Sequence, residues 1–132
     1  MTAPARSFHR NMTLPKNGEI FVFGSNFKGY HGAGAALIAA KYYRAIPGQF
    51  EGLQGQSYAI PTKGYHLKSY LSVAEIREWV DRFCTFTHDH PELRFFVTAV
   101  GCGYARNSHA DIAPLFATAI HCSFPLAWKP FL

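Results

Sequence analysis

The chain has 132 residues, enough for one domain with one hydrophobic core. Its 48% hydrophobic and 16% aromatic content is typical of a packed globular fold and excludes a wholly disordered chain. The apolar runs are all far shorter than the roughly 20 residues that span a bilayer, so no membrane partner is expected. The net charge of +5 favours anionic partners, but the cationic residues are dispersed, so nucleic acid is the less favoured partner.

The first part of the chain is interpreted as a loose arm, residues 1–17, followed by a single α/β domain, residues 18–132. Residues 1–15 lack the apolar core of a secretory signal. Three cysteines, Cys84, Cys102 and Cys122, show no metal-type spacing, which indicates reduced thiols in a cytoplasmic protein. The sequence predicts neither a metal site nor a cofactor, and it leaves the oligomeric state open.

Strands and helices are predicted to alternate along the domain. Strands are expected over residues 20–23, 57–60, 95–100 and 123–128, and helices over about 32–43, 72–90 and from about 112 onward. Residues 48–56 form a polar, Gly-rich loop. Ser72 and Glu75 have the spacing of a capping box, and Asp111 is expected to cap the last helix, with Pro114 in its first turn. This order predicts a three-layer α/β/α sandwich with a mainly parallel sheet.

The most informative segment lies where the first strand enters the first helix. Gly24, Ser25 and Asn26 follow the apolar run, and Gly32-Ala33-Gly34 opens the helix. A helix start offers unpaired backbone N–H groups and a positive dipole end, which together suit a phosphate. Glycine lets a ligand approach the main chain closely. The alternative is a tight strand-to-helix connection with no ligand.

A second Gly-rich segment, Gly101-Cys102-Gly103-Tyr104, follows the predicted strand 95–100. Two such loops at strand ends face each other across one crevice of a parallel sheet, where they suit the two sides of a diphosphate. The alternative is that the glycines only supply unusual backbone angles. No histidine is evidently paired with Cys102, so a catalytic thiolate is not favoured.

At these residues the chain resembles a macrodomain, the ADP-ribose-binding module. Asn26 resembles the family's loop Asn near the distal ribose, Gly32-Ala33-Gly34 its diphosphate loop, and Gly101 to Tyr104 its second loop, with Tyr104 as the aromatic. The resemblance covers roughly residues 19–128 and also extends to compact, uncharacterised bacterial and phage macro-like proteins. It implies a macrodomain fold and a nucleotide ligand such as ADP-ribose. The usual Gly-Asp-Ile element that supplies the adenine-recognising Asp is absent.

Whether the protein is also a hydrolase of an ADP-ribosyl bond stays open at this point. Glu51, in the Gly/Gln loop, is the carboxylate candidate for a general acid or a water-orienting base, and the alternative is an ordinary exposed Glu. His31 is the second catalytic candidate, and a hydrogen bond at the helix start is its alternative role. The competing functions are a non-catalytic module that sequesters a nucleotide signal and, less favoured, a nucleic-acid-binding protein.

Overall fold

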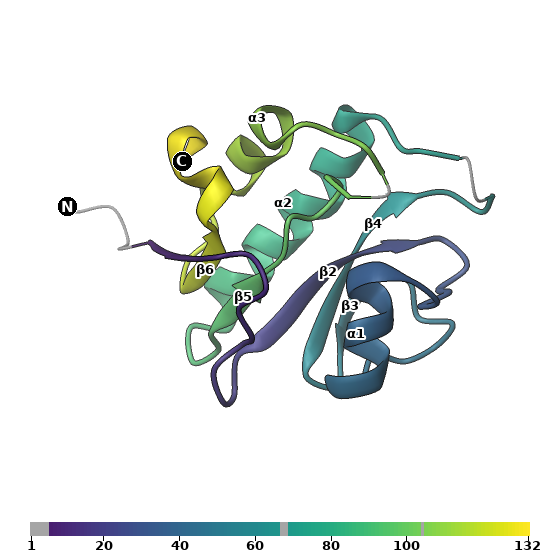
Figure 1. The fold of residues 1–132 in the computed structure, drawn as a ribbon, viewed down its shortest axis with the longest axis horizontal. Coiled ribbons are helices and arrows are strands. Elements are labelled where there is room, and N and C mark those ends of the chain that lie inside the picture. Colours follow the sequence, from purple (N-terminus) through teal and green to yellow (C-terminus); the bar gives the residue numbers. More distant parts are fainter. Residues whose placement is uncertain (1–5, 67–68, 104) are drawn as a thin grey trace.

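The computed structural model describes residues 6–66, 69–103 and 105–132, which form a sheet covered by helices on both faces (Figure 1). The sheet has the strand order β1-β6-β5-β2-β4-β3. All neighbouring strands pair in parallel except β3 and β4. The strands are β1 (Ser7–His9), β2 (Ile20–Asn26), β3 (Gly52–Gln54), β4 (Ser57–Lys63), β5 (Phe95–Val97) and β6 (Cys122–Pro125). The predicted α/β class with a mainly parallel sheet is therefore confirmed.

The central strand β2 is buried on both of its faces. Ile20 and Val22 belong to one apolar cluster, and Phe21 and Phe23 belong to another. Since side chains alternate between the faces of a strand, the two clusters lie on opposite sides of the sheet. Helix α1 (Gly34–Tyr42) covers the Phe21 face. The other face is covered by α2 (Val73–Asp89), α3 (His109–Ile112) and the 3₁₀ segments η1 (Ala113–Phe116) and η2 (Leu126–Phe131).

The predicted N-terminal cap is confirmed for α2 and is wrong for α3. Ser72 caps α2 through a capping box, in which the side chains of Ser72 and Glu75 each accept a hydrogen bond from the other residue's backbone N–H. The prediction that Asp111 caps the last helix is wrong. The helix begins earlier, at His109, because the Ser108 hydroxyl accepts a hydrogen bond from the Asp111 backbone N–H at 3.1 Å.

Four predictions about strands and loops also differ from the structure. The strand predicted over 95–100 ends at Val97. Ser7–His9 pairs with β6 as an edge strand, so this part of the predicted loose arm is ordered. The predicted loop 48–56 contains β3, which forms a hairpin with β4 through Gly55, whose φ is +58°. The final strand ends at Pro125 and continues as η2, so residues 126–128 are 3₁₀ rather than strand. Among the residues described, no helix is both long and apolar enough to cross a membrane.

Candidate functional site

The carboxyl ends of β2 and β4 and the loop after β5 come together at one place. A Cβ atom added to Gly24 would lie 3.2 Å from the Thr62 Oγ1 atom and 3.5 Å from the Gly101 backbone nitrogen. The Thr62 hydroxyl donates to the Ser25 carbonyl at 3.3 Å. Gly24 at the end of β2, Gly101 of the second Gly-rich loop and the Thr62 side chain therefore lie next to one another.

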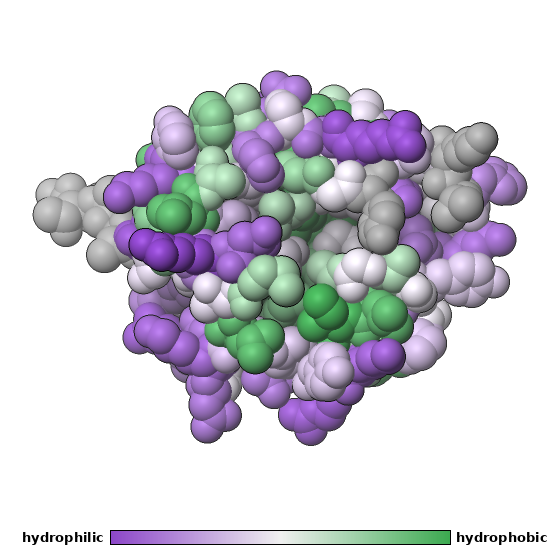
Figure 2. Space-filling model, viewed as in Figure 1, coloured by the Kyte–Doolittle hydropathy of each residue, from purple (hydrophilic) through white to green (hydrophobic). Residues whose placement is uncertain are grey.

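The face that carries the ends of these strands is hollowed. Figure 2 shows a hollow near the centre of the face, in the area where Figure 1 shows β2 passing between α1 and the chain after β5. Among residues 6–66, 69–103 and 105–132, no heavy atom lies within 4 Å of a Cβ atom added to Gly32 or to Gly103. The described residues therefore leave room for a close approach to the main chain at both of these glycines.

The start of α1 lacks a side-chain cap. Its N-cap residue, Ala33, is extended at φ −156° and makes no side-chain hydrogen bond, and no acidic residue occupies the first turn. Gly34 has a φ of +59°, a left-handed conformation that disfavours a side chain at this position. The backbone N–H groups of the first turn thus keep their hydrogen-bonding capacity and the positive end of the helix dipole. This arrangement suits an anion.

The polar residues that end β2 hold the first loop in shape. The Asn26 amide donates to the Tyr30 carbonyl at 2.9 Å and accepts from the Tyr30 backbone N–H at 3.0 Å. The Ser25 hydroxyl, which is buried, donates to the Phe50 carbonyl at 2.5 Å. Both side chains were predicted to contact ligand, and the geometry gives each of them an internal partner. Their described contacts support a role in positioning the loop backbone.

The second loop is closed by a residue that the sequence analysis missed. Asn107 donates to the Gly101 carbonyl from its backbone and from its side-chain amide, each at 2.9 Å. The Cys102 side chain packs against the core, and burial raises the pKa of its thiol to about 11. Cys102 therefore contributes its backbone to the loop rather than a thiolate. Tyr104, predicted as the aromatic of this loop, lies outside the described residues.

His31 is buried beneath the first loop. Its Nε2 atom lies 3.1 Å from the Ile46 carbonyl and 3.2 Å from the Gln54 Oε1 atom. Both neighbours are acceptors, so Nε2 carries a proton and donates it, which is consistent with the predicted alternative role of a local hydrogen bond. The Nδ1 atom is buried with no hydrogen-bond partner among the described residues. This geometry gives no support to His31 as a proton donor to a ligand.

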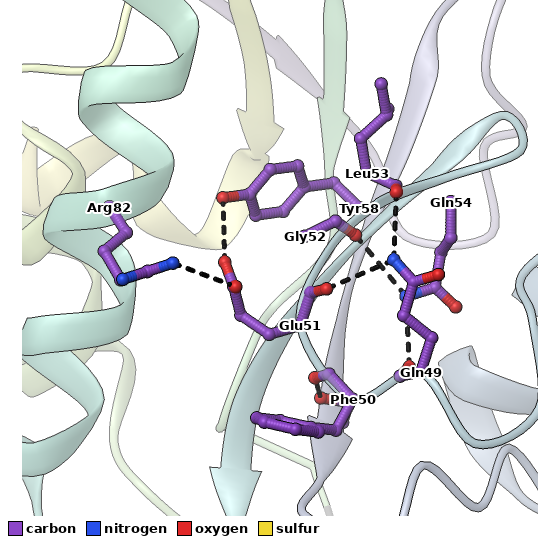
Figure 3. A network of polar contacts seen from close by, with 9 residues as sticks. Gln49, Phe50, Glu51, Gly52, Leu53, Gln54, Tyr58 and Arg82 are labelled. Atoms are coloured by element: carbon purple, nitrogen blue, oxygen red, sulfur yellow. Dashed lines mark hydrogen bonds and ion pairs between the residues drawn. The ribbon is translucent and has the colours of Figure 1, made fainter.

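The Glu51 side chain points toward Arg82 of α2 (Figure 3). Its carboxylate lies 3.2 Å from the Arg82 guanidinium and accepts a hydrogen bond from the Tyr58 hydroxyl at 3.4 Å. Burial, and secondarily the Glu51 charge, raises the pKa of Tyr58 above its usual value. These residues border a cavity of about 520 Å³ between β3 and α2, lined also by Leu53, Asp81, Thr85, Phe86 and Asp89. Through Tyr58 on β4 and Arg82 on α2, the Glu51 carboxylate thus links the sheet to α2.

Thr62 and Asn107 were not singled out from the sequence. Thr62 comes two residues after the predicted strand 57–60, so the rule that ligands bind at the carboxyl ends of parallel strands would have indicated it. Asn107 carries no such local signal, because its partner Gly101 is recognisable only in the folded loop. Among residues 6–66, 69–103 and 105–132, no group of three or more His, Cys, Asp or Glu residues is arranged to hold a metal ion.

The chain is similar to known proteins in structure but not in sequence. No protein-family model and no curated protein sequence matches this chain. The macrodomain of Mycobacterium tuberculosis DarG superposes with a TM-score of 0.70 at 15% identity, covering 93% of this chain and 98% of that one. A protein of unknown function from Bacteroides thetaiotaomicron superposes with a TM-score of 0.66 at 15% identity, covering 94% and 99%. Thermosipho africanus DarTG in complex with ADP-ribose superposes with a TM-score of 0.53 at 15% identity, covering 83% of this chain and 39% of that one. The chain therefore has a macrodomain-like fold.

Proposed function

We propose that the protein binds ADP-ribose or a related nucleotide diphosphate in the crevice between its two Gly-rich loops. The observation that carries the proposal is the start of α1, which has no side-chain cap and no acid in its first turn and lies two residues after Gly32, around which the described residues leave open space. A diphosphate supplies the anionic acceptors that such a helix start lacks. The similar fold of Thermosipho africanus DarTG in complex with ADP-ribose supports the same ligand class.

In this proposal the backbone carries most of the recognition. Gly32, Ala33 and Gly34 contact one side of the diphosphate, and Gly101 and Gly103 contact the other. The open Gly103 position and the hydrogen bonds of Asn107 favour a preformed second loop. We place this function in the cytoplasm, because the three cysteines are free thiols.

The direct test is a titration of the protein with ADP-ribose by calorimetry and by thermal melting. A ligand that binds only the folded state raises the free energy of unfolding by about 2.7 kcal/mol at a hundredfold excess over Kd. ADP-ribose should therefore raise Tm in a concentration-dependent way. The proposal fails if ADP-ribose, NAD and cyclic nucleotides leave Tm unchanged at millimolar concentration.

Hydrolysis of an ADP-ribosyl bond is a second candidate, and Glu51 is its test residue. If Glu51 acts as a general acid or base, Glu51→Gln should lower turnover by about 100-fold with little change in Kd for ADP-ribose. The matched control is Glu78→Gln, at an exposed position of α2. Wild-type protein that releases no product after long incubation would favour a sequestering module, and an active Glu51→Gln variant would exclude Glu51.

A further inference from the structure

Helix α1 carries almost no polar side chains on either of its sides. Of its nine residues, Gly34–Tyr42, only Lys41 is charged, and the others are Gly, Ala, Leu, Ile and Tyr. Ala36 and Ala39 belong to the buried cluster on the Phe21 face of the sheet. A helix that is apolar all round is normally covered on both sides, whereas a helix with one covered side has a polar outer face. The outer side of α1 therefore lacks the composition expected for contact with water.

The apolar residues on the outer side of α1 are exposed and adjoin one another. Ile38 is 41% exposed and Tyr42 is 71% exposed, and their i, i+4 spacing places them one turn apart on the same side. Leu37, which is partly exposed, and Lys41, which is exposed, form the next row of the helix. We call these four residues the α1 face. Figure 2 shows hydrophobic colour gathered over α1, beside the hollow near the centre of the view. Contiguous exposed apolar surface marks contact with another molecule.

The charge around the α1 face has a single sign. Residues 20–50 contain no Asp or Glu, and they carry Lys28, Lys41 and Arg44, which are all exposed. Among residues 6–66, 69–103 and 105–132, no carboxylate lies within ion-pair distance of Lys41. A cation within an apolar face loses its hydration when the face is covered, unless the covering molecule supplies a negative charge. The molecule that covers the α1 face should therefore be acidic as well as apolar.

We propose that the α1 face docks an α-helix of a partner protein, whose apolar stripe is flanked by an acidic side chain opposite Lys41. The i, i+4 rows of α1 fit the grooves between the rows of a second helix. A carboxylate that meets Lys41 in the covered interface forms a charge pair, and such pairs select the partner and set its register.

Two other occupants fit the α1 face less well. A symmetric pair of copies would bring two positively charged faces together, with no carboxylate in residues 20–50 to separate them. A lipid surface suits a helix that keeps its charges on a side facing water. In α1 the side opposite the α1 face is buried in the core, and Lys41 lies within the face itself. A protein helix of complementary charge satisfies both observations.

The experiment uses two synthetic peptides, each about 18 residues long because shorter peptides form little helix. They share one stripe of leucines and differ beside it, where one carries Glu and the other Lys. Fluorescence anisotropy measures their binding to the full chain, and the acidic peptide should bind much more tightly than the basic one. Ile38→Gln should weaken binding of the acidic peptide by about 5-fold or more, the scale of truncating a residue central to an interface. Lys41→Glu should reverse the preference and favour the basic peptide.

The matched controls lie on η2, which covers the other face of the sheet. Leu126→Gln replaces an aliphatic side chain that is 44% exposed, close to the value for Ile38. Lys129→Glu changes the net charge of the protein as much as Lys41→Glu does. Both controls should bind the acidic peptide like the wild type. All variants should keep their Tm and their affinity for ADP-ribose, so a failure of ADP-ribose binding would concern the earlier proposal and not this one.

The proposal is overturned if the acidic peptide does not bind, if the basic peptide binds wild type equally well, or if Ile38→Gln and Lys41→Glu bind the acidic peptide like the wild type. A dimer that sedimentation detects and that Ile38→Gln dissociates would assign the α1 face to a second copy. Binding to anionic phospholipid vesicles that Ile38→Gln abolishes would assign the face to lipid. Either result also overturns the proposal.

Discussion

Gly32 and Gly34 look alike in the sequence, yet the structure gives them different roles. Gly34 has a φ of +59°, so any other residue there would be strained. Gly32 has no such backbone angle, and an added Cβ would project into open space. The sequence could predict a glycine-dependent loop but not which glycine serves the turn and which leaves room for a ligand, because that distinction depends on φ.

This difference makes Gly32 the better position for testing ligand contact. Gly32→Val should weaken ADP-ribose binding by at least about 10-fold, because its side chain would occupy the space of the diphosphate, while Tm should stay close to that of the wild type. Calorimetry and thermal melting measure the two effects. Gly34→Val, by contrast, should lower Tm as well. Equal ADP-ribose affinity of wild type and folded Gly32→Val would show that no ligand approaches this residue.

The roles of the two catalytic candidates, Glu51 and His31, depend on partners that residue type does not reveal. Glu51 and His31 were selected because a carboxylate and an imidazole can transfer protons, and that property belongs to the residue alone. Their partners come from distant segments. Arg82 reaches Glu51 from α2, and Gln54 reaches His31 from β3. Such long-range partners leave no pattern in the local sequence.

At the scale of elements, the sequence correctly predicts where α2 begins. The Ser72–Glu75 spacing predicted a capping box, and both hydrogen bonds are present. Strand β1 could not be predicted, because three residues are too few to show the alternation of apolar and polar side chains that indicates a strand. It exists because β6 offers it a parallel partner and because His9 stacks on Phe96, with ring centroids 3.8 Å apart.

Removal of the capping hydroxyl should destabilise the protein by a measurable amount. Ser72→Ala leaves the Glu75 backbone N–H without its acceptor, so we expect the free energy of unfolding to fall by about 1 kcal/mol. Urea denaturation measures this change. Ser72→Asp retains an acceptor and should stay near the wild-type value. A Ser72→Ala variant as stable as the wild type would mean that solvent replaces the cap at no cost.

Edge strand β1 should make stability depend on pH. Burial lowers the pKa of His9 below its usual value of 6.5, and the nearby Glu19 charge partly offsets this shift. The unfolded chain therefore takes up the proton first as the pH falls, so the His9 contribution to stability is present above about pH 6.5 and is lost below it.

His9→Phe keeps a ring on Phe96 but cannot be protonated. The loss of Tm between pH 7.5 and pH 5 should therefore be smaller in His9→Phe than in the wild type, as measured by thermal melting across this range. Identical pH profiles for His9→Phe and wild type would show that His9 protonation does not affect folding.

At the scale of the whole molecule, the alternation of strands and helices was enough to predict a parallel sheet with two covered faces. The order of its strands was not predictable, because it depends on which distant segments pair. The consequence for the site is direct. β2 lies between β5 and β4, so the loop after β5 and Thr62 on β4 both reach the Gly24 end of β2.

Ligand binding in this crevice should leave a pattern in backbone hydrogen exchange. ADP-ribose should slow exchange of amides in residues 24–34, 98–103 and 105–107, since these segments hold or flank the glycines of the proposed site. Amides of β1, at the far edge of the sheet, should exchange as in the free protein. Mass spectrometry of peptides resolves the two regions. Uniform protection throughout the chain would indicate general stabilisation, and protection confined to the α2–β3 cavity would place the ligand elsewhere.

The β3 edge of the sheet has a consequence for behaviour at high concentration. The Gln49 side-chain amide donates to the Leu53 and Glu51 carbonyls, and the Gln54 amide donates to the Gln49 and Gly52 carbonyls. Two carbonyls of this short edge strand, those of Gly52 and Leu53, thus already accept hydrogen bonds from the side chains of Gln54 and Gln49. An incoming β-strand from another molecule would have to displace them before it could pair. The protein therefore carries a built-in barrier to edge-to-edge aggregation on the side where its sheet is antiparallel.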